Sequence, residues 1–330
     1  CIAGRSSLIE TLMAAPIHFD SLDAFQVDSD QSVHLAMGMF DGVHRGHRVV
    51  VESAIRAAAE QGGLAGVLTF WPHPSRLFSP ENPVRMILNS EMKQAELEKL
   101  RIDFVVEEPF TKAFASTESN GFVKMLKSKI PTLASLHTGE NWRFGKGRLG
   151  DVGFLNQLAA NEDVKTYALD CLYVDGERVS STRIRNALSD GRMSEANRLL
   201  GYLYESIGTV TEGKRIGRTI GVPTLNLPFE GDLPPLYGVY AVRVSCEHGE
   251  ERLRAVANFG VRPTVNALKS PLLEAHVLED CPFSYEERLR VEWETFIRPE
   301  IKFDSIDILK EQIGSDIASA NTFFKEALDG

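Results

Sequence analysis

The chain has 330 residues, of which 43% are hydrophobic and 25% are charged, and its formal net charge is −10. This length is enough for two ordinary domains, and the composition excludes collagen, a disulfide-rich miniature scaffold and a mostly disordered chain. Acidic residues outnumber basic ones in both halves of the chain. A nucleic-acid partner, which requires a basic surface, is therefore not expected.

No run of residues reaches the roughly 18 uncharged apolar positions of a membrane helix, which predicts a soluble protein without a membrane partner. The four cysteines are scattered and lack the spacing of metal ligands. We therefore predict free thiols and a cytoplasmic protein. Residues 1–12 lack the features of a signal peptide, and we interpret them as a non-native extension upstream of Met13. Nothing in the sequence indicates an oligomeric state.

From about residue 33 to 200, short apolar runs alternate with helical patterns. Strands are predicted at Val33–Phe40, Leu64–Phe70, Ile102–Glu107, Leu133–Thr138 and Val164–Val174. Helices are predicted between them at Gly46–Glu60, Glu91–Leu100, Gly121–Ile130 and Asp151–Ala160. This alternation is typical of a doubly wound parallel sheet, which makes the first half an α/β domain.

After Leu200 the pattern changes to β-rich runs that are separated by turn residues. Strands are predicted at Tyr237–Cys246, Leu253–Phe259, Leu272–Leu278 and Leu289–Phe296, followed by a helix from Ser305 to Leu328. Short strands in succession indicate a small antiparallel β-barrel, here with a terminal helix. The sequence thus predicts an α/β domain over residues 13–203 and a β domain over residues 204–330.

A glycine-rich segment joins the first predicted strand to the first long helix. It reads Gly38-Met39-Phe40-Asp41-Gly42-Val43-His44-Arg45-Gly46-His47. Ligands bind at the carboxyl edge of such sheets, where a helix N-terminus offers N–H donors to phosphate. His44 and His47 are three residues apart, so both can face one side of the first helical turn. There they can donate hydrogen bonds to phosphoryl oxygens.

This segment resembles the G-x-F-D-G-x-H-x-G-H motif of the nucleotidyltransferase domain in bacterial bifunctional riboflavin kinase/FAD synthetases. Three later stretches resemble the same family in the same order: T-F-W-P-H-P from Thr69, G-E-N-W-R-F-G from Gly139 and S-S-T-R-I-R from Ser180. The resemblance implies a Rossmann-like domain that binds ATP through Gly38, Phe40, Asp41, Gly42, Asn141, Ser181, Thr182 and Arg183. Two alternatives remain open: Ser181 and Thr182 can instead cap a helix, and Asn141 can be a turn residue.

A second glycine-rich segment begins the second predicted domain. Gly213, Gly217 and Gly221 would form a flap whose N–H groups reach phosphates, although the glycines alone also fit a loose hairpin. The stretch Pro223-Thr224-Leu225-Asn226 resembles the P-T-x-N signature of riboflavin kinases, with Leu where the family has Ala. The oxygens of Thr224 and Asn226 are hard donors suited to Mg²⁺ that is shared with ATP. Structural turn bonds are the alternative for these two residues.

Further stretches resemble the riboflavin kinases in the expected order. They begin at Tyr237 (Y-G-V-Y), Asn258 (N-F-G-V-R-P-T), Glu274 (E-A-H) and Ile297 (I-R-P-E). In that family the glutamate of the E-x-H stretch is the proposed catalytic base. The resemblance therefore implies that Glu274 accepts the proton of the riboflavin hydroxyl during phosphoryl transfer. Without the resemblance, a glutamate on a strand is interpreted as a solvated charge.

The resemblance covers nearly all of residues 17–328 and implies two consecutive reactions. The C-terminal domain would phosphorylate riboflavin with ATP to give FMN, with Glu274 as base. The N-terminal domain would join FMN to the AMP part of a second ATP, giving FAD and pyrophosphate, with His44 and His47 as catalytic residues. The expected ligands are thus riboflavin, FMN, FAD, ATP and Mg²⁺.

Two other functions are compatible with parts of the sequence. The first is an adenylyltransferase that acts on a different substrate, and the kinase-like second half argues against it. The second is a flavin-sensing regulatory protein that has lost catalysis. The presence of Glu274, His44 and His47 argues against that interpretation.

Overall fold

The computed structural model describes residues 15–27, 30–213, 221–247, 249–261 and 271–329. The chain divides into two compact units, Cys1–Val179 and Ser180–Gly330, each with its own buried core. The sequence predicted the division after residue 203. Because the observed division lies after Val179, two helices, α8 (Ser181–Ser189) and α9 (Met193–Leu200), belong to the second unit. The domain bounds of 13–203 and 204–330 remain a prediction about function.

The first unit contains a six-stranded sheet in which all neighbouring strands are parallel, in the order β1-β4-β3-β2-β5-β6. Its strands are β1 (Ile17–Phe19), β2 (Val33–Met37), β3 (Leu64–Trp71), β4 (Phe104–Pro109), β5 (Leu133–Gly139) and β6 (Lys165–Leu169). All five residues of β2 are buried, as expected for a central strand with helices on both faces. The predicted doubly wound α/β fold is confirmed.

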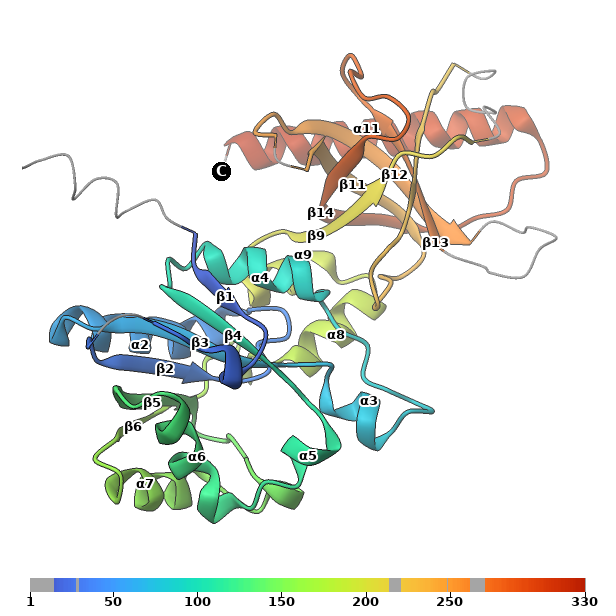
Figure 1. The fold of residues 1–330 in the computed structure, drawn as a ribbon. Helices are drawn as coiled ribbons and strands as arrows, with labels where there is room; N and C mark the ends of the chain where they lie inside the picture. Colours follow the sequence, from blue (N-terminus) through green and yellow to red (C-terminus); the bar gives the residue numbers. More distant parts are fainter. Residues whose placement is uncertain (1–14, 28–29, 214–220, 248, 262–270, 330) are drawn as a thin grey trace, which may run out of the picture. The chain divides into compact units, whose positions relative to one another are not determined.

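Helices cover both faces of this sheet. They are α2 (Arg45–Gln61), α3 (Pro74–Phe78), α4 (Ser90–Glu98), α5 (Lys112–Ala115), α6 (Phe122–Lys129) and α7 (Val152–Ala160). Helix α2 lies on the opposite side of the sheet from α6 and α7 (Figure 1). It ends at Gly62, whose φ of 70° gives the left-handed conformation that closes many helices.

Two predicted strands end earlier than expected. The strand predicted at Val33–Phe40 stops at Met37, because the chain turns at Gly38 into the glycine-rich segment. The run Val164–Val174 is not one strand: β6 stops at Leu169. The last two residues of the predicted run form β7 (Tyr173–Val174). This short strand pairs with β8 (Glu177–Arg178) in a separate hairpin around Gly176, where φ is 77°.

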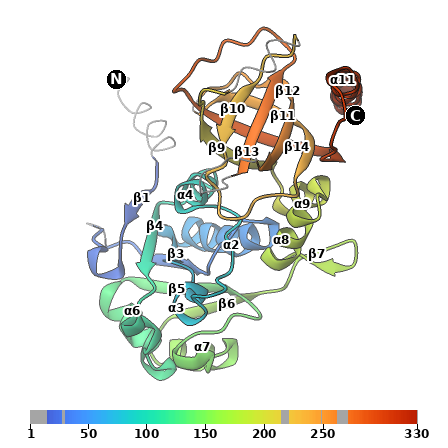
Figure 2. The ribbon, with the colours of Figure 1, turned by 90° about the vertical axis from the view of Figure 1, so that its right-hand side faces the viewer.

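The second unit is an antiparallel sheet in the order β10-β13-β12-β11-β14-β9, with a long terminal helix. Its elements are β9 (Tyr204–Thr209), β10 (Leu225–Pro228), β11 (Gly238–Cys246), β12 (Leu253–Val261), β13 (Pro271–Val277), β14 (Arg288–Pro299) and α11 (Ile306–Asp329). Just beyond β9, Thr211 forms an antiparallel bridge to Asn226 of β10, which joins the two ends of the sheet. The strands therefore curl into a barrel, with α11 outside it (Figure 2). The predicted barrel and terminal helix are confirmed.

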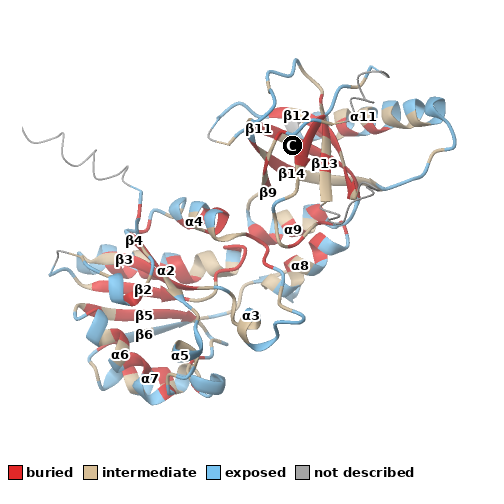
Figure 3. Cartoon of the chain, turned by 45° about the vertical axis from the view of Figure 1, so that its right-hand side comes forward, coloured by how far each residue is buried: buried red, intermediate tan, exposed pale blue. Residues whose placement is uncertain are grey.

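Aromatic side chains fill the barrel. Trp293 is fully buried, and the rings of Tyr204, Tyr240 and Phe259 lie around it with centroids 4.8–6.2 Å away. The indole N–H of Trp293 donates to the hydroxyl of Ser206 at 2.8 Å, so its polar atom is satisfied in the core. Figure 3 shows buried residues on inner strands of each sheet, such as β2, β5 and β11, whereas α11 presents an exposed outer face. Among the described helices, none is both long enough and apolar enough to cross a membrane.

Candidate functional site

The glycine-rich segment lies at the point where the order of strands reverses. From β2 the chain proceeds to β3 and β4 on one side, and then returns to β5 on the other side of β2. Open α/β sheets bind ligands in the crevice at such a switch point, beyond the carboxyl ends of the strands. The segment Gly38–His44 follows β2, and the exposed Asn141 follows β5. The topology thus places both motifs at neighbouring strand ends of the same edge.

The segment after β2 has an unusual backbone. Phe40, Gly42 and Val43 have φ angles of 48°, 84° and 34°. Glycine adopts such angles without strain, but a bulky or β-branched residue does so at a cost of about 1–3 kcal/mol. A Cβ atom added to Gly38 would lie 3.2 Å from the ring of Phe40, which is 1% exposed. This turn is therefore strained and closely packed, and surrounding contacts must hold it.

Asp41 is one of the residues that hold this turn. Its side chain is 2% exposed, and Oδ1 accepts the backbone N–H of Ile87 at 2.9 Å. The carboxylate thus links the glycine-rich segment to the chain that leads into α4. The predicted contact between Asp41 and ATP stays a prediction.

His44 and His47 form a stacked pair at the start of α2. Their ring centroids are 3.5 Å apart and their planes differ by 14°. His44 is the N-cap residue of α2, and its Nδ1 accepts the backbone N–H of His47 at 3.2 Å. Because Nδ1 is an acceptor, the proton of a neutral His44 ring lies on Nε2. The pair can therefore present imidazole donors beside the N-terminal end of a long helix, where anions are stabilised.

Among the residues of α8 that are predicted to bind ATP, Arg183 already has partners in its own unit. The N-cap of α8 is Ser180, whose hydroxyl accepts the backbone N–H of Arg183 at 3.3 Å. The capping role considered for Ser181 and Thr182 therefore belongs to their neighbour. The guanidinium of Arg183 pairs with Glu195 of α9, with Nε and Nη2 each 2.9 Å from Oε1. That these α8 residues join the histidine pair around ATP stays a prediction.

In the barrel, two sequence motifs meet on adjacent strands. Asn226 of β10 is the cross-strand partner of Glu274 on β13, and Glu274 is also the partner of Asn258 on β12. Residues in such a row share one face of the sheet, so their side chains are neighbours. Thr224, which is exposed, lies two positions before Asn226. The structure thus brings the P-T-x-N and E-x-H motifs together.

Two further contacts fix the P-T-x-N segment. A Cβ atom on Gly213 would lie 2.3 Å from Nδ2 of Asn226, so only glycine permits this close approach. The ring of His276 lies against the carbonyl of Pro223, with Nδ1 and O 2.8 Å apart, which makes Nδ1 the donor. Gly221 has a φ of 84° and open space beside it. Gly217 lies outside the described residues.

The sequence reasoning missed a buried lysine behind the first motif. Lys93 of α4 is 1% exposed, and its Nζ lies 2.7 Å from Oε1 of Glu107 on β4. Burial lowers the pKa of Lys93, while Glu107 and Asp41 oppose that shift. The available signal was periodicity: Lys93 occupies the same helical stripe as the buried Leu97.

Comparisons with known proteins match both units. A FAD synthetase family model matches residues 26–183, and a riboflavin kinase family model matches residues 200–324. The bifunctional riboflavin kinase/FMN adenylyltransferase of Haemophilus influenzae is 35% identical over 299 residues, covering 89% of this chain and 95% of that protein. The Escherichia coli K12 protein of the same description is 34% identical over 290 residues, covering 88% and 92%.

A solved structure described as a macrolide-efflux protein from Streptococcus pneumoniae has a similar fold. It superposes with a TM-score of 0.84 at 28% identity and covers 93% of this chain and 99% of that one. The likeness therefore extends through both units. Since curated relatives match over nearly their whole length and both family models are present in order, the chain belongs to the bifunctional riboflavin kinase/FMN adenylyltransferase family.

Proposed function

We propose that each of the two activities of this family uses one of the two motif sites: FMN formation at the Asn226–Glu274 row, and FAD formation at the His44–His47 pair. The observation that carries the kinase assignment is the direct cross-strand pairing of Asn226 with Glu274. The adenylyltransferase assignment rests on the stacked histidines at a helix N-terminus beside the switch point. The substrates of the two reactions are riboflavin, FMN and ATP.

In the kinase reaction, a riboflavin hydroxyl oxygen bonds to the γ-phosphorus of ATP, and the bond to ADP breaks. The hydroxyl proton needs an acceptor, and the carboxylate of Glu274 accepts it. Asn226 is 7% exposed and held beside Glu274 by the strand register. This pairing holds the proposed base Glu274 beside Asn226, the proposed contact to Mg²⁺ and the ATP phosphates.

Mg²⁺ suits the donors of this barrel site. The described residues contain no group of three His, Cys, Asp or Glu side chains that could hold a metal ion. Mg²⁺ commonly takes few protein ligands and completes its shell with water and substrate phosphates. The hydroxyl of Thr224 and the amide oxygen of Asn226 would hold it, and when bound it would neutralise charge on the transferring phosphate.

In the adenylyltransferase reaction, a phosphate oxygen of FMN bonds to the α-phosphorus of ATP, and pyrophosphate leaves. The attacking phosphate is already an anion, so no base is needed. The chemistry instead needs donors for oxygens that gain negative charge, and Nε2–H of His44 and the ring of His47 supply them. Exposed Asn141 at the neighbouring strand end would contact the nucleotide.

Glu274→Gln and His47→Gln test the assignment in parallel. Each variant is incubated with riboflavin, ATP and Mg²⁺, and FMN and FAD are separated by chromatography. A second reaction starts from FMN. Glu274→Gln should lose FMN formation by roughly 10²–10⁴-fold and keep FAD formation from supplied FMN. His47→Gln should do the reverse. A folded variant that loses both reactions equally would contradict the two-site assignment.

The location of these reactions is part of the same proposal. The described cysteines, Cys171, Cys246 and Cys281, are free thiols. Free thiols are characteristic of a reducing compartment, which supports a cytoplasmic enzyme with small-molecule partners.

A further inference from the structure

Helix α4 points two charged side chains into the interior of the first unit. Lys93 and Glu96 lie one helical turn apart, and only 1% and 3% of their surfaces are exposed. Charged side chains are almost never buried this completely unless they are paired. Both have partners on other elements, and both sets of contacts lead to the glycine-rich segment after β2.

The first path runs from Lys93 through Thr69. Nζ of Lys93 donates to the hydroxyl of Thr69 at 3.2 Å, and that hydroxyl donates to the carbonyl of Met39 at 3.1 Å. The lysine charge is balanced by Glu107, whose second oxygen accepts the hydroxyl of Ser90 at 2.7 Å. Lys93 is thus two hydrogen bonds away from the backbone of the strained turn.

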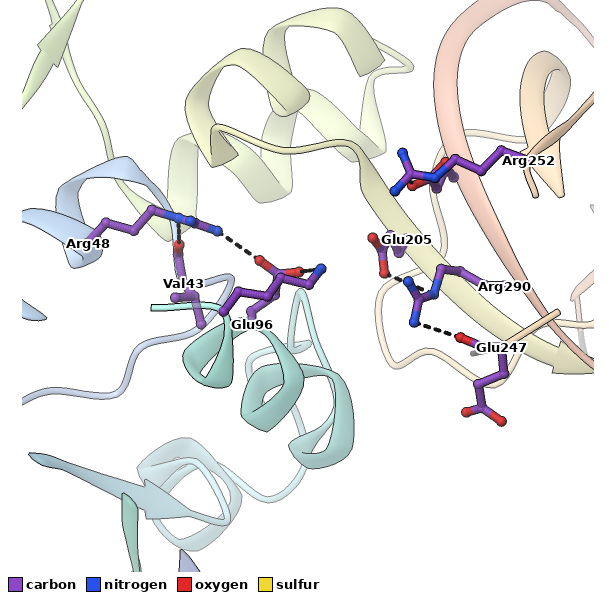
Figure 4. A network of polar contacts seen from close by, with 9 residues as sticks. Val43, Arg48, Glu96, Glu205, Glu247, Arg252 and Arg290 are labelled. Atoms are coloured by element: carbon purple, nitrogen blue, oxygen red, sulfur yellow. Dashed lines mark hydrogen bonds and ion pairs between the residues drawn. The ribbon is translucent and has the colours of Figure 1, made fainter. Parts of the chain in front are cut away.

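The second path runs from Glu96 through Arg48, as Figure 4 shows. Nη2 of Arg48 lies 2.8 Å from Oε2 of Glu96, and its Nε donates to the carbonyl of Val43 at 3.2 Å. The two paths reach Met39 and Val43, which lie at the two ends of the turn. Within this turn, Phe40 and Val43 are the non-glycine residues with strained positive φ angles. A strained turn persists only when its surroundings determine it more than once, and α4 provides two of these constraints.

We propose that Lys93 is a positioning residue for adenylyl transfer, which holds the Gly38–His47 segment in its reactive geometry through Thr69 and Met39. Glu96 acts in the same way through Arg48 and Val43. With 1% of its surface exposed, Lys93 does not touch a substrate and acts through the turn. The inference rests on the proposed role of the His44–His47 pair. A purely structural ion pair between Lys93 and Glu107 is the competing interpretation.

The test removes the charges without leaving one of them buried alone. Lys93→Met/Glu107→Leu replaces the pair with apolar side chains, a change that often preserves stability. Its kcat for FAD formation from FMN should fall about 10- to 100-fold, because small misplacements of reacting groups have effects of this size. The KM for ATP should change less than kcat. FMN formation by the same preparation should be unchanged, and the melting temperature should stay close to that of the wild type.

Thr69→Val provides an independent variant that keeps both charges. It removes only the hydroxyl that links Lys93 to Met39, and kcat for FAD formation should again fall. This variant decides the question if the double variant does not fold. As a matched control, Lys129→Met/Asp23→Asn removes an ion pair on the surface of the same unit. That control should leave both activities unchanged.

A double-mutant cycle separates positioning from stability. His47→Gln should lower kcat for FAD formation by a smaller factor in the Lys93→Met/Glu107→Leu background than in the wild type, because the histidine is already misplaced there. Wild-type kcat in both the double variant and Thr69→Val would overturn the inference. Wild-type kcat in His47→Gln alone would instead overturn the proposed site. The two failures are therefore distinguishable.

Discussion

Asn226 and Glu274 lie directly opposite each other on β10 and β13, although they belong to motifs that are far apart in the sequence. The register of one strand pair therefore sets the distance between the proposed metal contact and the proposed base. A register shift of one residue would turn one of these side chains to the other face of the sheet. The function of this site thus depends on how β10 is anchored, and Gly213 and His276 provide two of the anchors.

Asn226→Ala should weaken the binding of Mg²⁺ at the kinase site. The substitution deletes one hard oxygen donor, and Mg²⁺ tolerates incomplete octahedral geometry poorly. FMN formation should fall by about 10- to 1000-fold, with a higher Mg²⁺ concentration at half-maximal rate. FAD formation from supplied FMN should be unaffected. The measurement is a Mg²⁺ titration of both reactions, and an unchanged curve would remove Asn226 from the metal site.

Leu225→Ala is the matched control for that titration. Leu225 is 8% exposed and its neighbour across the sheet is the buried Ala275, so it lies on the opposite face from Asn226. Truncation should lower the free energy of unfolding by about 2–5 kcal/mol. The Mg²⁺ dependence of the folded enzyme should not change.

Gly213→Ala should impair the kinase through Asn226. The new methyl group would lie 2.3 Å from Nδ2 of Asn226, so one of the two residues must move. FMN formation should fall by at least tenfold, an effect of the size seen when one oriented contact is lost. Gly314→Ala on α11 is a suitable control, because apart from the adjacent residues and the backbone of its own helix no atom lies within 4 Å of the added Cβ position. Equal kinase rates in the two variants would show that this close approach does not position Asn226.

Much of the fold was predictable because its elements follow simple periodicities. The alternation of strands and helices in the first half predicted the parallel sheet, and the succession of β-rich runs predicted the barrel. The edge strand β1 was missed, because three half-exposed or exposed residues carry no apolar pattern. Strand β9 was missed for a related reason: its glutamate and glycine obscure an alternation of buried and partly buried residues.

The sequence motifs of the candidate sites could be predicted, but the contacts between their side chains could not. The sequence could place His44 and His47 on one turn, yet their stacking and the cap formed by Nδ1 of His44 depend on the strained turn before them. Lys93 could not be singled out for another reason. It shares the helical stripe of the buried Leu97, but a lysine in an amphipathic helix is usually solvated, and the tertiary fold is needed to show that Glu107 and Thr69 surround it.

Buried hydroxyl and imidazole groups form a hydrogen-bonded series that runs from β2 and β5 to α2. Ser135 links Nδ1 of His34 and Nε2 of His137 at 2.7 Å each, and Nδ1 of His137 lies 2.9 Å from the hydroxyl of Ser53. Burial, with smaller contributions from His34 and Arg56, lowers the pKa of His137 to about 3. The folded state therefore keeps this ring neutral over a pH range in which the unfolded chain binds a proton.

Because His137 stays neutral in the folded state, we expect the protein to lose stability on mild acidification. Because the pKa of His137 is lower in the folded state, its contribution is fully present above pH 6.5 and declines as the pH falls toward 3. Between pH 6.5 and 5 the loss is about 2 kcal/mol from this group. Urea unfolding at several pH values should show a smaller decline for His137→Asn than for the wild type. Parallel pH curves for the two proteins would exclude His137 as the source.

Contacts of helix α9 with the barrel determine where the chain can be divided. Asn197 of α9 donates through Nδ2 to the carbonyl of Trp293 at 2.8 Å, and its Oδ1 accepts the backbone N–H of Tyr204 at 2.7 Å. The same helix buries four apolar side chains: Met193, Ala196, Leu199 and Leu200. A fragment that begins at Tyr204 would lose these contacts and leave the Trp293 carbonyl without its Asn197 donor.

A fragment that begins at Ser180 keeps α9 and should be the more stable of the two. Losing a buried leucine side chain alone costs about 2–5 kcal/mol, which is a large part of the 5–15 kcal/mol that stabilises a typical domain. We expect the Ser180–Gly330 fragment to fold and to form FMN at a rate close to that of the full chain. The Tyr204–Gly330 fragment should melt at a lower temperature, as measured by circular dichroism, and lose FMN formation in proportion to its unfolded fraction. Equal melting temperatures would mean that α9 contributes nothing to the barrel and that the boundary after residue 203 is sufficient. If the longer fragment folds but forms no FMN, the kinase site needs residues that precede Ser180.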